Sequence, residues 1–171
     1  MMELREGELL LSIPESARAT RFDGSDHGLP PCMAAVDFVI EEEDRVILLE
    51  IKDFEHTAAR AHGSPPQTQK IQDDLWSWIR KFRDSFIYLW ALDRLGPKRE
   101  CYVVLESRNI GRELLLQIND DFARRLPDAA RLPEIVAQRW ERHPVWRCAV
   151  LDIKEWNRRM PGFPIRRVSA D

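Results

Sequence analysis

The sequence predicts an α/β domain with a mixed central sheet flanked by helices. Three observations indicate this fold: two adjacent apolar runs typical of a β-hairpin, a long segment with helical spacing after them, and further short apolar runs separated by helical segments. The chain has 171 residues, of which 44% are hydrophobic, which suffices for one sizeable core but not for two. We therefore expect residues 1–171 to form a single domain.

The first part of the chain holds an apolar run, a loop and a connection around the predicted hairpin. Residues 8–13 are apolar and bounded by a glycine and a proline, so they fit either a strand or a short helix. Residues 21–31 are rich in Gly, Asp and Pro and indicate a loop, in which His27 is expected to cap a turn rather than to bind a ligand. After the hairpin, residues 54–66 are expected to form a connection.

A long amphipathic helix is predicted over residues 67–95, where Gly96 and Pro97 stop it. Its apolar positions recur at spacings of three and four: Leu75, Trp76, Ile79, Phe82, Phe86, Leu89 and Trp90. This spacing is typical of a face that packs on a sheet, so we interpret the aromatic residues as core and not as platforms for nucleic-acid bases. Lys81 and its basic neighbours are expected on the solvated face.

The rest of the chain predicts two strands and two helices. Residues 101–106 and 146–153 are short apolar runs typical of strands, whereas residues 112–125 and 132–142 have helical spacing. The order of strands, long helix, strand, helices and strand favours a sheet with both parallel and antiparallel neighbours.

Charge and cysteine usage narrow the functional class. The 26 basic residues nearly balance the 29 acidic ones, so the net charge of −3 creates no global field that attracts nucleic acid or an anionic membrane. Nucleic-acid binding would need a local patch, and basic pairs such as Arg158 and Arg159 are expected to be solvated surface. The three cysteines are widely spaced, which is typical of a reduced cytoplasmic protein. The sequence shows no signal peptide and no run near the ~18 apolar residues of a membrane span, so we expect a cytoplasmic protein with no membrane partner.

Residues 36–53 are predicted to form a tight β-hairpin that brings charged side chains together. If residues 43 and 44 are central in the turn, residue 40 faces residue 47 and Asp37 faces Glu50. Side chains alternate along a strand, so Lys52 shares the face of Glu50, and directly opposed residues hold their Cβ atoms about 5 Å apart. A turn one residue longer would change this facing, and Glu-Asp is a poor sequence for the primed turns.

The apolar neighbours of this charged group predict a cation. Two carboxylates in a partly dry place repel each other, so one must take up a proton or both must share a positive charge. Carboxylate oxygens, backbone carbonyls and water suit Mg²⁺ or Mn²⁺, with positions left for a phosphate. Lys52 would then position or deprotonate the attacking water and offset charge in the transition state.

This arrangement resembles the PD-(D/E)XK nuclease superfamily, which includes many restriction endonucleases and resolvases. Its mark is an acidic residue early in one core strand and an acid-x-Lys triplet on the next, which Asp37 and Glu50-Ile51-Lys52 match. The resemblance implies a restriction-endonuclease-like αβββαβ core and metal-dependent hydrolysis of nucleic acid, with DNA as the expected substrate, in repair, restriction or defence. It implies Asp37, Glu50 and Lys52 as catalytic residues, and Asp37, Glu50 and the Ile51 carbonyl as ligands of Mg²⁺ or Mn²⁺. Many members dimerise to cut both strands, so a homodimer fits as well.

The sequence also departs from the family pattern. Many members have a proline where Val36 stands, and members often add an acid from a helix before the first core strand and a Gln or Lys from the helix after the triplet. The candidates for these additions are Glu3, Glu6, Glu8, Glu15, Gln67, Gln69 and Lys70. Two other interpretations of the charged group therefore stay open: a salt-bridge cluster on a half-exposed hairpin, and a nuclease-like scaffold that binds a protein or nucleic acid without cutting.

Overall fold

The structure is a computed structural model that describes residues 1–24, 28–55, 67–96, 98–108, 110–129, 131–139, 145 and 147–168, and within these ranges it omits the side chains of residues 67–70, 72 and 137. His27 and residues 56–66 of the predicted connection lie outside the described residues. No described helix is long and apolar enough to cross a membrane.

The main sheet has five strands in the order β3-β4-β5-β6-β7. They are β3 (Arg18–Arg21), β4 (Phe38–Glu41), β5 (Arg45–Asp53), β6 (Lys98–Glu106) and β7 (Arg147–Asp152). The neighbours β3, β4 and β5 are antiparallel, whereas β5, β6 and β7 are parallel. The prediction of an α/β fold with a mixed sheet is therefore confirmed.

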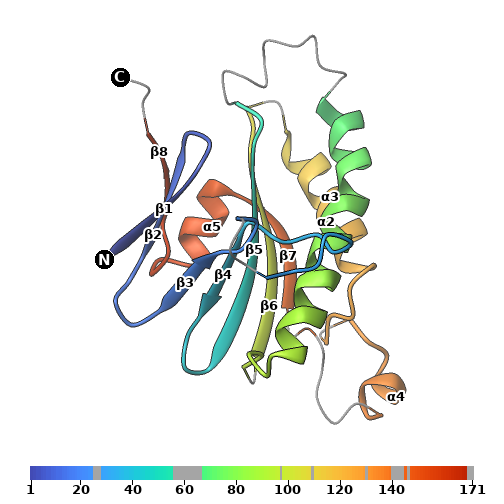
Figure 1. Ribbon diagram of the computed structural model, residues 1–171. Helices are drawn as coiled ribbons and strands as arrows, with labels where there is room; N and C mark the ends of the chain where they lie inside the picture. Colours follow the sequence, from blue (N-terminus) through green and yellow to red (C-terminus); the bar gives the residue numbers. More distant parts are fainter. Residues whose placement is uncertain are drawn as a thin grey trace.

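Helices cover one face of the main sheet, and a helix with a second sheet covers the other. In Figure 1, α2 (Gln67–Ala91) and α3 (Arg112–Ala123) lie on one side of the main sheet, and α5 (Ile153–Arg159) lies on the opposite side with the second sheet. The second sheet has the order β1-β2-β8 and consists of β1 (Met2–Glu6), β2 (Leu9–Ile13) and β8 (Ile165–Arg167). The run at residues 8–13 is thus a strand, because its alternate residues Leu9, Leu11 and Ile13 are fully buried.

Strict alternation along β5 divides the apolar core into two clusters, one on each face of the main sheet. Val46 and Leu48 belong to the cluster under α2 and α3, whereas Ile47 and Leu49 belong to the cluster under α5 and the second sheet. Glu50 is two positions after Leu48, so its side chain lies on the same face as Val46 and Leu48, which is the face that α2 covers.

The buried face of α2 differs from the prediction. Trp76 and Trp90 are 60% and 68% exposed, although the sequence pattern placed both in the core. Two polar residues, Lys81 and Ser85, lie on the packed face of α2. A prediction based on apolar residues alone omits these two positions and therefore places the buried face too far around the helix. The buried face is centred on Ile71, Leu75, Trp78, Ile79, Phe82, Ser85 and Leu89.

The helix predicted over residues 132–142 is confirmed only for α4 (Glu134–Ala137). Pro133 is its N-cap residue, and residues 140–142 lie outside the described part. Ile135 is 67% exposed, so the segment buries little apolar surface that would stabilise a longer helix.

Asn157 connects α5 to the last strand and provides a stability test of this layer. Its side-chain amide donates to the Ile165 carbonyl, and its side-chain carbonyl accepts from the Ile165 N–H, both at 2.8 Å. We expect Asn157→Ala to lower the free energy of unfolding by about 2 kcal/mol, because each such hydrogen bond contributes about 1 kcal/mol. Urea unfolding measures this change. Gln117→Ala, at an exposed position on α3, should cost under about 0.5 kcal/mol, and equal losses in both variants would contradict the expectation.

Candidate functional site

The β4–β5 hairpin has the register that the sequence predicts. Ile40 pairs with Ile47, and the Glu42 N–H donates to the Arg45 carbonyl at 2.9 Å across the turn. Continued by one position beyond the last pair, Phe38 and Leu49, this register sets Asp37 opposite Glu50. The predicted hairpin is therefore confirmed, with one difference: Asp37 stands one residue before the start of β4 and not within the strand.

Helix α2, and not the sheet, holds the segment that leads to Asp37. The Ala34 N–H donates to Asp84 Oδ2 at 2.8 Å, and the Val36 N–H donates to Ser85 Oγ at 3.1 Å. Because these backbone groups bond to α2, residues 34–36 cannot use them to extend the ladder of β4. Asp37 itself is fixed through Oδ2, which accepts a 2.7 Å hydrogen bond from the Ile51 N–H.

Two carboxylates and two ammonium groups meet between β5 and α2. Asp37 and Glu50 are buried, with 2% and 0% of their surfaces exposed. Lys52 Nζ lies 2.6 Å from Glu50 Oε1 and 4.0 Å from Asp37 Oδ2. Lys81 Nζ bridges both acids, at 2.6 Å from Glu50 Oε1 and 3.2 Å from Asp37 Oδ1. The predicted residues Asp37, Glu50 and Lys52 thus come together, and Lys81 completes a four-residue group that we call the acid–lysine cluster.

Lys81 is the residue of the cluster that the sequence prediction missed. The basic residues of the long helix were expected at the solvated surface. However, Lys81 lies three residues after the buried Trp78 and four before the buried Ser85, on the packed face of α2. A lysine at a core position of an amphipathic helix requires a buried anion, and this signal would have pointed to the acids of the hairpin.

Burial dominates the electrostatics of the cluster. It raises the pKa of Glu50 to about 7, and the nearby Asp37 charge adds to this rise while the two lysines oppose it. Burial also acts to lower the pKa of Lys81, but the charges of Glu50 and Asp37 together outweigh it, so the pKa of Lys81 is raised. The lysine therefore stays protonated, whereas Glu50 is poised to change its charge near neutral pH.

The donors of the cluster fit a magnesium-type ion with a small number of protein ligands. Among the described residues, Glu50 Oε2 is buried and accepts no hydrogen bond, so one carboxylate oxygen is left for a cation. No group of three or more His, Cys, Asp and Glu side chains suited to a metal occurs in the described part of the chain. Mg²⁺ keeps several water ligands and is often held by only one or two carboxylates, so a pair such as Asp37 and Glu50 is compatible with it. Apart from Glu50 Oε2, the oxygens of the pair contact Lys81 Nζ or the Ile51 N–H.

Among Glu3, Glu6, Glu8 and Glu15, the N-terminal candidates for an additional metal ligand, Glu6 has a pKa that responds to the charge of Asp37. Its pKa is raised by burial and then by the charge of Asp37, and it forms an ion pair with Arg21 at 3.1 Å. The other three form ion pairs elsewhere: Glu3 with Arg166, Glu8 with Arg167 and Glu15 with the N-terminal amine. The side chains of Gln67, Gln69 and Lys70 lie outside the described part.

Comparisons with models of protein families, with curated proteins and with solved structures each found no match.

Proposed function

We propose that this chain is a metal-dependent nuclease that hydrolyses phosphodiester bonds of nucleic acid, with DNA as the expected substrate. One observation carries the proposal: the buried carboxylates of Asp37 and Glu50 face each other across a hairpin, with the Lys52 ammonium 2.6 Å from Glu50. Buried like charges are costly, and a protein that keeps them together usually uses them.

The order of elements supports the same proposal. Three antiparallel strands, β3 to β5, are followed by α2, β6 and α3, which matches the βββαβ part of the core that the resemblance implies. Strands β1 and β2, and no helix, precede them in the described residues 1–24. The acid of the first helix in many nucleases of this superfamily would therefore have to come from a strand, where Glu6 is the candidate.

Each member of the cluster receives a role from its position. Asp37 and Glu50, with the Ile51 carbonyl, would hold Mg²⁺ or Mn²⁺. The bound ion supplies Lewis-acid polarisation of a phosphoryl oxygen. The side chain of Lys52 is 28% exposed, so its ammonium can reach a phosphate from solvent, orient the attacking water and offset negative charge in the transition state. Lys81 neutralises the two carboxylates from the α2 side and holds them in place.

A second candidate function is a nuclease-like scaffold that binds a partner without cutting. The observation that favours it is the charge balance of the cluster, in which the ammonium groups of Lys52 and Lys81 already compensate both carboxylates. A cluster of this kind is stable without a metal and supports the fold alone.

Titration of Mn²⁺ and a cleavage assay on the same samples separate the two functions. We expect the wild-type chain to bind Mn²⁺ and to cut plasmid or single-stranded DNA, and Asp37→Asn to lose both. Asparagine keeps the shape of aspartate and an acceptor for the Ile51 N–H, so the variant should still fold, which circular dichroism checks. Glu43→Gln, at the exposed hairpin turn, removes one acid elsewhere and should change neither result.

The outcomes of this experiment are distinct. Metal binding without cleavage by the wild-type chain would favour the scaffold. Absence of metal binding would refute the nuclease proposal and assign Asp37, Glu50 and Lys52 to structural charge.

A further inference from the structure

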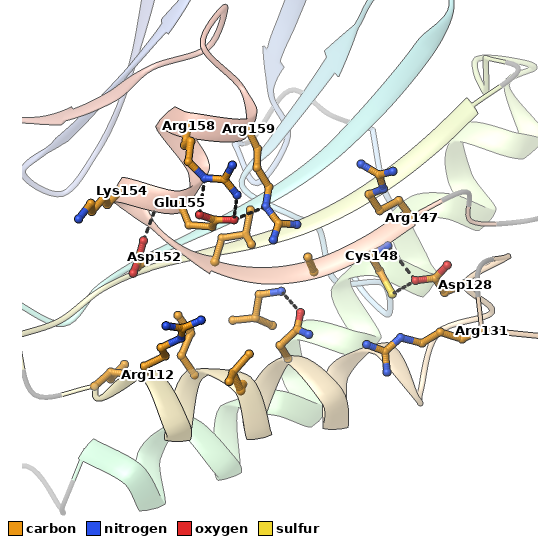
Figure 2. Close-up of a pocket in the computed structure, with 17 residues that line it drawn as sticks. Arg112, Asp128, Arg131, Arg147, Cys148, Asp152, Lys154, Glu155, Arg158 and Arg159 are labelled. Atoms are coloured by element: carbon orange, nitrogen blue, oxygen red, sulfur yellow. Dashed lines mark hydrogen bonds and ion pairs between the residues drawn. The ribbon is translucent and has the colours of Figure 1, made fainter.

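Strand β7, at the edge of the main sheet, forms the floor of a cationic groove that shares no residue with the acid–lysine cluster. Helix α5 lies on one side of this groove and α3 on the other, as Figure 2 shows, and its volume is about 720 Å³. Six lining residues are cationic: Arg112, Arg131, Arg147, Lys154, Arg158 and Arg159. Three are acidic: Asp128, Asp152 and Glu155. The groove is thus positive in a chain whose net charge is −3.

The three acids of the groove are engaged in local structure. Asp128 Oδ2 accepts from the Cys148 N–H at 3.3 Å and from its thiol at 3.2 Å. The Asp152 side chain caps α5 by accepting from the Glu155 N–H at 2.6 Å. Asp128 and Asp152 therefore serve the fold and pair with none of the six described cations, whereas Glu155 pairs with Arg158 and Arg159.

Three cations of the groove form ion pairs: Arg158 and Arg159 with Glu155, and Arg131 with Asp120 at 3.1 Å. Glu155 accepts from Arg158 and from Arg159, each with a contact of 2.6 Å, which orients both guanidinium groups. Arg112 and Lys154 are exposed and form no ion pair with any described residue. Figure 2 shows them on opposite sides of β7, with Lys154 on α5 and Arg112 on α3. A polyanion in the groove would therefore meet positive charge from both walls.

The edge of β7 is closed to an added strand. Its outward N–H groups at Cys148 and Val150 already donate to Asp128 and to Asn119 Oδ1, the latter at 3.0 Å. An extended peptide that paired here would have to break these bonds. The described residues that line the groove also include no aromatic side chain, so it offers no stacking platform for an unpaired base.

We propose that this groove binds the phosphodiester backbone of a nucleic-acid duplex, as a contact separate from the acid–lysine cluster. Cations without base-reading or stacking groups bind the sequence-independent part of a duplex, its phosphates. The positive charge of the groove does not depend on the proposed nuclease function. The choice of phosphodiesters over other polyanions as the ligand rests on that proposed function. This contact would hold the duplex while the cluster acts on it.

Fluorescence anisotropy with a labelled duplex of mixed sequence tests the proposal. EDTA in the buffer removes divalent metal ions and so prevents metal-dependent cleavage during the measurement. We expect the double variant Arg112→Gln/Lys154→Gln to bind about tenfold more weakly than wild type and to lower the slope of log K against log salt by about 2, one for each lost phosphate contact. The control Arg18→Gln/Arg139→Gln removes the same charge at two exposed positions outside the groove and should bind like wild type.

Three results would overturn the proposal: equal weakening in both double variants, no weakening in the groove variant, or equally tight binding of a poly-glutamate peptide. Thermal melting of each variant checks that it is folded. Asp37→Asn should lose cleavage and still bind the duplex like wild type. Absence of cleavage by the wild-type chain, with groove-dependent binding intact, would refute the nuclease function alone. Cleavage that survives without groove-dependent binding would refute the groove alone.

Discussion

Lys81→Met is expected to lower the free energy of unfolding by about 3–5 kcal/mol at pH 8, the range seen when one partner of a buried ion pair is removed. The variant leaves Asp37 and Glu50 facing each other in a buried place with only Lys52, which lies 4.0 Å from Asp37. Methionine keeps the length and apolar stem of lysine, so the loss reports the missing ammonium and not a cavity. Chemical denaturation at pH 8 measures it.

Two further measurements show whether the loss comes from uncompensated charge. Adding Glu50→Gln to Lys81→Met should recover much of the stability, because a single buried carboxylate then remains beside Lys52. Lys98→Met breaks a similar ion pair at the surface, between Lys98 and Asp44 at 3.0 Å, and should cost no more than about 1 kcal/mol. Losses of similar size in Lys81→Met and Lys98→Met would show that the cluster is not electrostatically buried.

The stability of wild type is expected to fall as the pH rises from about 4.5 to about 7, through the titration of Glu50. The folded state holds the pKa of Glu50 at about 7, above the ordinary value of 4.5, so in this window it binds more protons than the unfolded chain. The contribution is complete below about 4.5 and is lost as the pH passes through 7. The difference between the two pKa values corresponds to about 3 kcal/mol, reached above pH 7.

Glu50→Gln isolates this contribution, because glutamine does not titrate. The free energy of unfolding, measured by urea at several pH values, should decrease less with pH in Glu50→Gln than in wild type. Glu43→Gln, which replaces an exposed turn residue, should keep the slope of wild type. Parallel pH profiles of wild type and Glu50→Gln would contradict the raised pKa.

The hairpin and its acids were predictable because their causes are local. A two-residue turn sets the register of both arms, and alternation then puts Asp37, Glu50 and Lys52 on one face without reference to the rest of the chain. The same holds for β6 and β7, whose short apolar runs bounded by polar residues indicate strands. Asp152 ends β7 one residue early, because its side chain caps α5.

The features that the sequence did not predict depend on contacts between distant segments. Lys81 belongs to the cluster only because α2 packs across β5. Its spacing from Trp78 and Ser85 indicates the packed face of the helix, but the acids that it contacts come from a segment 31 and 44 residues earlier. The sequence did not predict the cationic groove either, because Arg112 and Lys154 are distant in sequence and line the same groove only in the folded protein. The second sheet joins the two ends of the described chain, which no local pattern reveals.

The pairing of β2 with β8 determines when the protein can finish folding during its synthesis. Arg167 of β8 binds Glu8, which lies 159 positions earlier in the turn before β2, and β2 and β8 cover the face of the main sheet opposite α2. A nascent chain on the ribosome therefore has every strand of the main sheet before it can complete this layer. Until β8 emerges, the second sheet lacks its third strand, and long-range pairing of this kind slows the completion of folding.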